Sequence, residues 1–92
     1  MEILQTKRFK QAVKKLNAKQ KEELDKTIKI IVDNPFIGQQ KVGDLDFLRV
    51  YKFRMNNQLM LLAYSYEEQI ITLTLLDLGS HENFYRDIKR YF

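Results

Sequence analysis

The sequence predicts an α+β domain, because the spacing of its apolar residues changes once along the chain. Over residues 7–33 these residues recur at the three- and four-residue intervals of amphipathic helices. From Phe47 onward they follow the shorter period of strands, in three segments separated by turn residues. The predicted order is β-α-α-β-β-β-α, with an antiparallel sheet packed against an N-terminal helical hairpin and a C-terminal helix.

The chain opens with a predicted short strand over residues 2–5, followed by a helix over residues 7–16. Thr6 precedes this helix, and threonine is a favoured N-cap because its hydroxyl accepts a backbone N–H of the first turn. The inward-facing apolar residues of the helix are Phe9, Ala12, Val13 and Leu16.

A second helix is predicted over residues 18–33. Asn17 and Gln20 have the spacing of a capping box, in which each side chain bonds the other residue's backbone N–H. Asn34-Pro35 ends the helix, since the residue before a proline disfavours helical geometry. The apolar face consists of Leu24, Ile28, Ile31 and Val32. So short a connection between two helices predicts an antiparallel hairpin.

The first two strands of the predicted meander differ in pattern. Residues 48–55 alternate between apolar and polar, as in a strand with one exposed face. Asn56-Asn57 suits a two-residue turn, because asparagine tolerates positive φ. Residues 59–64 are almost continuously apolar, which is typical of a central strand covered on both faces.

The last predicted strand is followed by the C-terminal helix. A turn near Glu67-Glu68 leads into residues 70–76, which carry the strongest strand signal in the chain. Gly79 is expected to break this strand, and Ser80 is expected to cap the final helix.

Length and composition limit the possible classes of protein. The chain has 92 residues, which suits one domain over residues 1–92, and its net charge of +4 favours nucleic acid or an acidic protein as partner. Cysteine is absent and there is one histidine, so we expect no metal site and no cofactor. No segment resembles a signal peptide or a membrane span, so we expect a cytoplasmic protein with no membrane partner.

Basic residues within the first meander strand are candidates for phosphate binding. Strand geometry places Lys52 and Arg54 on one face with Val50, and Arg49 on the other face with Tyr51 and Phe53. Arginine binds phosphate through two N–H groups and lysine adds a point charge. The alternative is a solvated face whose basic side chains cover apolar surface with their aliphatic stems.

The C-terminal segment contains the only histidine of the chain. His81, Tyr85 and Lys89 are spaced by four residues, so a helix starting near His81 would present all three on one face. His81 can transfer protons near neutral pH, and Tyr85 can donate a proton or stack on a base. Alternatively, His81 bonds local backbone groups and Tyr85 belongs to the core. Further phosphate contacts could come from Arg86, Lys89 and Arg90, or these residues form a solvated face.

Such residues suffice for one reaction that needs no metal. In RNA the 2′-hydroxyl can attack the adjacent phosphate, provided that a base accepts its proton and an acid protonates the 5′ leaving oxygen. Cationic side chains then stabilise the charge that develops on phosphorus.

These features together resemble the RelE/ParE superfamily of bacterial type II toxins. The resemblance covers essentially the whole chain. It rests on the first helix from Phe9 to Leu16, the helix end at Asp33-Asn34-Pro35, the basic strand 49–54, Ala63-Tyr64 and the segment Leu78-Gly79-Ser80-His81. The superfamily contains ribosome-dependent mRNA endonucleases and also inhibitors of DNA gyrase.

The resemblance implies roles for particular residues and for partners. In nucleases with a similar tail, the histidine and an aromatic residue four positions later take part in cleavage; these correspond to His81 and Tyr85. Basic residues on the second sheet strand bind the scissile phosphate, which implies that role for Lys52 and Arg54, with Arg49 as a further phosphate contact. A cognate antitoxin is the expected protein partner, and mRNA on the ribosome the expected substrate.

The chain departs from the RelE-like pattern in one respect. Many RelE-like nucleases have an arginine early in the third strand, whereas this chain reads Gln58-Leu59-Met60-Leu61-Leu62. A RelE-like tail also often supplies a catalytic arginine, for which Arg86 and Arg90 are the candidates. Two further hypotheses therefore stand beside the endonuclease: a gyrase inhibitor without nuclease activity, and an inactive relative that retains only antitoxin binding.

Overall fold

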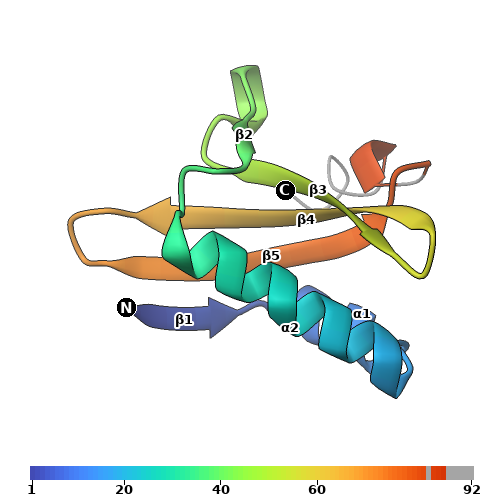
Figure 1. Ribbon diagram of the computed structural model, residues 1–92. Coiled ribbons are helices and arrows are strands. Elements are labelled where there is room, and N and C mark those ends of the chain that lie inside the picture. Colours follow the sequence, from blue (N-terminus) through green and yellow to red (C-terminus); the bar gives the residue numbers. More distant parts are fainter. Residues whose placement is uncertain (83, 87–92) are drawn as a thin grey trace.

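A computed structural model describes residues 1–82 and 84–86 and contains a five-stranded sheet with the strand order β1-β5-β4-β3-β2 (Figure 1). The strands are β1 (Glu2–Gln5), β2 (Gln39–Gln40), β3 (Arg49–Met55), β4 (Gln58–Glu67) and β5 (Thr72–Ser80). The helices are α1 (Lys7–Lys14) and α2 (Ala18–Asp33), with a 3-10 turn at Gly43–Leu45 and helical backbone at residues 84–86. The predicted α+β class is confirmed.

The N-terminal half matches the prediction closely, because short-range signals determine it. Thr6 caps α1 by accepting the Phe9 N–H at 3.0 Å, and its hydroxyl donates to the Leu76 carbonyl of β5 at 2.6 Å. The capping box of Asn17 and Gln20 starts α2, with both reciprocal hydrogen bonds present. Each helix therefore begins at the residue that the sequence predicts.

The sheet carries apolar residues on both faces. The helix-side core lies between the sheet and the two helices, and α2 crosses the sheet in Figure 1. Its buried members are Phe9, Leu24, Ile31, Met55, Met60, Leu62, Tyr64, Leu73, Leu75 and Leu78. The far-side core consists of Leu45, Leu48, Val50, Leu61, Ala63, Leu76 and Phe84. Strand β4 supplies buried residues to both cores, as its continuous apolar run predicts.

The C-terminal predictions were wrong in their boundaries. The last strand begins at Thr72 instead of Ile70 and continues through Gly79 to Ser80. Long-range pairing explains both ends, because Thr72 pairs with Glu2 of β1 and Gly79 pairs with Leu61 of β4. Ser80 ends the strand, and a turn at residues 81–82 follows it. Ser80 therefore does not cap the helical turn that includes residues 84–86, contrary to the prediction.

The sequence pattern indicated neither strand β2 nor the sheet partner of strand β1. Strand β2 has two residues and pairs antiparallel with β3 through Gln39↔Val50 and Gln40↔Arg49. Strand β1 was expected as a strand, but its parallel pairing with β5 at the edge of the sheet was not. Both pairings join segments that are distant in the sequence, so local periodicity does not indicate them.

The turn before β5 has a strained backbone. Ile71 has a φ of +50°, a left-handed conformation that is unfavourable for a β-branched residue, and its side chain is exposed. Replacing Ile71 with asparagine is expected to raise the free energy of unfolding by about 1 kcal/mol, because asparagine tolerates this conformation. Thermal unfolding should show an increase in Tm of roughly 4–8 °C for a chain of this size.

The control for this substitution is Ile70→Asn, which removes the same exposed side chain one position earlier in the turn. Equal effects of the two substitutions would show that backbone strain at Ile71 is not the cause.

Candidate functional site

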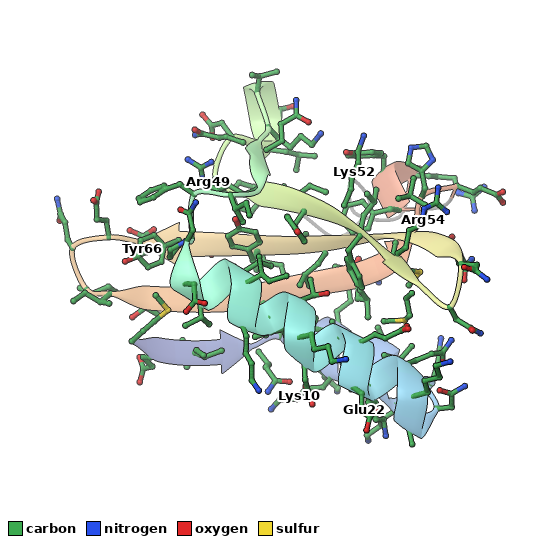
Figure 2. All side chains as sticks on the ribbon, in the orientation of Figure 1. Lys10, Glu22, Arg49, Lys52, Arg54 and Tyr66 are labelled. Carbon is green, nitrogen blue, oxygen red and sulfur yellow. The ribbon has the colours of Figure 1, made fainter. Side chains whose placement is uncertain are left out.

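The basic pair of β3 lies on the face of the sheet opposite the helices. Lys52 is directly across from Leu61 of β4, a member of the far-side core, and Arg54 is across from Leu59. Both basic side chains are exposed, whereas Tyr51 and Phe53 pack against the helix-side core. The predicted division of this strand between two faces is confirmed. In Figure 2, Lys52 and Arg54 lie toward the orange-red turn at the end of the described chain.

His81 lies beside the same part of the sheet. Its backbone N–H donates to the carbonyl of Leu59 at 3.1 Å, and Leu59 is paired with Arg54 on its other side. Arg54 and His81 therefore lie on either side of Leu59. Their backbones are about 10 Å apart, because that is the width of two strand spacings. The His81 side chain is exposed. This position is within reach of a ligand that also contacts Arg54.

The predicted helical row of His81, Tyr85 and Lys89 is not what the structure shows. His81 belongs to a turn, and helical backbone is described at residues 84–86. The hydrogen bond from His81 to Leu59 continues the register of β5 with β4 and so delays the start of the helix. Lys89 and Arg90 lie outside the described residues. Arg86 is exposed in the helical turn.

Tyr85 is held on the far side of the sheet by its neighbours. Phe84 is buried against the far-side core and approaches Gly79 of β5, where an added Cβ would be 3.4 Å from its ring. The half-buried Tyr85 ring meets Phe84 edge-on, with ring centroids 5.4 Å apart. The ammonium of Lys41 lies 4.7 Å from the centroid of the Tyr85 ring. Sequence reasoning missed Lys41, because its polar surroundings show no periodicity or motif.

Arg49 is not part of this group. Its guanidinium donates to the carbonyls of Phe36 at 3.2 Å and Gly38 at 2.8 Å, and it lies 5.1 Å from the Phe36 ring. These contacts are on the helix side of the sheet, and Figure 2 shows Arg49 toward the end of β3 away from Arg54. These contacts indicate that Arg49 fastens the loop after α2, and its contact with phosphate stays a prediction.

Tyr64 holds the same loop in place. Its fully buried hydroxyl donates to the Pro35 carbonyl at 2.7 Å and accepts the Gly38 N–H at 2.9 Å. A Cβ at position 38 would lie 2.7 Å from the Tyr64 oxygen, so only glycine at this position allows the loop to approach Tyr64 this closely. Burial raises the pKa of the Tyr64 phenol above its ordinary value of 10.0, and the hydrogen bond from Gly38 acts in the opposite direction. This anchored loop leads directly into β2 and Lys41.

An ion pair joins the N-terminal helix to β5. The Arg8 Nε donates to Asp77 Oδ2 at 2.8 Å, and the Asp77 side chain is 7% exposed. The other carboxylate oxygen of Asp77 accepts the Leu78 N–H. This pair fixes α1 against the strand that ends at the candidate site.

The described residues were also considered as possible metal ligands and as possible membrane-spanning helices. Over residues 1–82 and 84–86, histidine and carboxylate side chains do not gather in groups of three or more of the kind that could hold a metal ion. Neither α1 nor α2, the helices described here in full, is long and apolar enough to span a bilayer.

The far side of the sheet therefore combines two exposed cations, an exposed imidazole and a phenol beside a third cation. Two cations can neutralise a phosphate, and an imidazole and a phenol can accept and donate protons. These groups come from β3, from the turn after β5, from the helical turn and from the segment after β2.

Comparison with known proteins shows the family to which the chain belongs. Residues 3–89 match the family model of the ParE-like toxins of type II bacterial toxin–antitoxin systems. The chain belongs to this family and thus to the RelE/ParE superfamily that the sequence analysis indicated. A comparison with curated protein sequences gave no match.

Solved structures give the same fold at low sequence identity. A mutant of the E. coli toxin RelE in the free state is 18% identical, with a TM-score of 0.71 over 99% of this chain and 97% of that one. RelE in the intact E. coli RelBE toxin–antitoxin complex is 18% identical, with a TM-score of 0.70 over 86% and 94% of the two chains. A conserved hypothetical protein of Helicobacter pylori, HP0892, is 20% identical with a TM-score of 0.56 over 89% and 96%.

Proposed function

We propose that this toxin is a ribosome-dependent endoribonuclease that inhibits translation by cleaving mRNA in the ribosomal A site. The observation that supports this most directly is the placement of Lys52, Arg54, His81 and Tyr85 on one side of the sheet. A target on the ribosome implies that the protein acts in the cytoplasm.

Each residue has a definite part in the proposed reaction. The RNA 2′-hydroxyl attacks the adjacent phosphorus as a base takes its proton, and the 5′ oxygen leaves with a proton from an acid. The products are a 2′,3′-cyclic phosphate and a free 5′-hydroxyl. His81 serves as the base or the acid, and Tyr85 donates a proton or stacks on a base. Lys52 and Arg54 hold the phosphate and stabilise its developing charge, so no metal is needed. Arg86, which is exposed in the helical turn, is the proposed contact for a neighbouring phosphate.

A second candidate function is inhibition of DNA gyrase without nuclease activity. Two observations favour it: the matching family model is that of ParE-like toxins, and β4 (Gln58–Glu67) has no basic residue. Under this hypothesis His81 is dispensable, and the basic far side contacts the protein or its DNA.

An antitoxin is the proposed protein partner under either hypothesis. RelE is known in complex with its antitoxin RelB and with a peptide of RelB. In this chain the exposed faces of α1 and α2 carry many lysines, and acidic residues of an antitoxin would complement them. We propose that the antitoxin covers the helices and an edge of the sheet.

Induced expression in a bacterial host distinguishes the two functions. The nuclease hypothesis predicts a loss of amino-acid incorporation within minutes, while DNA synthesis continues. The double substitution His81→Ala/Tyr85→Phe is expected to abolish this arrest, because it removes both proton-transfer groups and leaves the buried residues of the sheet unchanged.

The matched control is Tyr66→Phe, which removes a phenol oxygen from the far end of β4 (Figure 2) and should leave toxicity unchanged. Circular dichroism verifies that each variant folds. A fully toxic double variant, or an arrest of DNA synthesis before translation, would contradict the nuclease and favour gyrase as the target.

A further inference from the structure

We propose that Lys41 is a positioning residue of the candidate active site and acts by fixing the ring of Tyr85. This inference rests on the proposed nuclease function and extends it to a residue outside the predicted site. The Lys41 Nζ lies 4.7 Å from the centroid of the Tyr85 ring, inside the distance of about 6 Å at which a cation is attracted by an aromatic face.

The backbone of Lys41 is itself held in place. Its N–H donates to the Leu48 carbonyl at 3.1 Å, and the preceding residue, Gln40, pairs with Arg49 of β3. Leu45 and Leu48 are buried in the far-side core, so the loop between β2 and β3 is anchored at both of these positions. The lysine side chain therefore extends from a fixed base toward Tyr85.

Tyr85 needs such a contact, because it is less well fixed by its own segment. Phe84 is 2% exposed and anchors the helical turn, whereas Tyr85 is half-buried and meets Phe84 only edge-on. The contact with Lys41 joins it to a loop far away in the sequence. A lysine that merely solvates the surface would be exposed, as Lys10 and Lys14 of α1 are, but Lys41 is half-buried.

Proton transfer is sensitive to the position of the phenol, so loss of this contact should act on the reaction more than on binding. Replacing Lys41 with methionine keeps the length of the aliphatic stem and removes the charge. We expect kcat for mRNA cleavage on ribosomes to fall about 10-fold, with KM changed less than about 2-fold. Lys41→Arg should retain most of the wild-type kcat, because a guanidinium binds an aromatic face equally well.

Two controls separate positioning from a general effect of charge. Lys10→Met removes one positive charge from the helix side of the sheet and should leave both constants unchanged. In a Tyr85→Ala background, Lys41→Met should have no further effect on the residual rate, because the two residues act as one unit. A rise in KM with constant kcat would overturn the proposal and indicate that Lys41 contacts phosphate directly.

NMR gives a readout that does not depend on activity. In the wild type the protons on the Lys41 Cε should be shifted upfield by the Tyr85 ring current, and Tyr85→Ala should abolish this shift. Absence of the shift would overturn the proposal whatever the function. If the shift is present but wild-type protein cleaves no mRNA, the nuclease and the role of Lys41 in it both fail, while the contact itself stands.

Discussion

Replacing Lys52 and Arg54 together with glutamine is expected to lower kcat/KM for mRNA cleavage on the ribosome by about 10²–10³-fold. Removal of a single donor that stabilises transition-state charge commonly costs that much. Both side chains are exposed on β3 and point away from the helix-side core, so the substitutions should leave stability within about 0.5 kcal/mol of the wild type.

The control for this experiment is Lys10→Gln/Lys14→Gln, which makes the same change in net charge on exposed positions of α1. Rates are measured with purified protein and programmed ribosomes at several salt concentrations. The β3 variant should lose far more activity than the α1 variant at each of them, because local contacts with phosphate persist where long-range attraction is screened. Equal losses would show that only the overall positive charge matters.

Tyr64→Phe is expected to reduce the free energy of unfolding by about 3 kcal/mol, the largest effect on stability that we predict. The substitution removes an oxygen that both accepts the Gly38 N–H and donates to the Pro35 carbonyl in the interior of the protein. Buried polar groups left without partners cost about 1–3 kcal/mol. The Tm should fall by about 12–24 °C, as measured by thermal unfolding. A loss below about 1 kcal/mol would contradict the role of the hydroxyl as an anchor.

Tyr64 also makes the free energy of unfolding depend on pH in alkaline solution. Burial raises the pKa of Tyr64 above 10.0 in the folded protein, so between about pH 10 and the folded pKa the unfolded chain binds fewer protons. The stabilisation is complete below pH 10 and is lost as pH rises through the folded pKa, with a slope of at most about 1.4 kcal/mol per pH unit. The difference in unfolding free energy between wild type and Tyr64→Phe should therefore shrink above pH 10. A constant difference would contradict this.

The structural features that depend on short-range contacts could be predicted from the sequence. The N-caps at Thr6 and Asn17 and the asparagine turn at residues 56–57, which has positive φ at both positions, are local features and were all predicted. The division of β3 between two faces follows from the period of a strand, and it predicts the face on which Lys52 and Arg54 lie.

The predictions that failed depend on contacts between distant segments. Pairing with β1 and β4 sets the ends of β5, and this moves His81 out of the helix in which sequence spacing had placed it. The guanidinium of Arg49 donates to the Phe36 and Gly38 carbonyls of the loop after α2, whereas that of Arg54 donates to the Asn57 carbonyl of the adjacent turn at 3.3 Å. Lys41 acquires its partner only when the loop before β3 meets the turn after β5.

The most direct test of the proposed nuclease function is to incubate the purified toxin with mRNA, alone and on programmed ribosomes, and to map the new RNA ends. The nuclease hypothesis predicts new RNA ends within the A-site codon. These ends should appear only when ribosomes are present and should be absent with the His81→Ala variant. Intact mRNA under all conditions, together with inhibition of DNA supercoiling by gyrase at the same protein concentration, would contradict it.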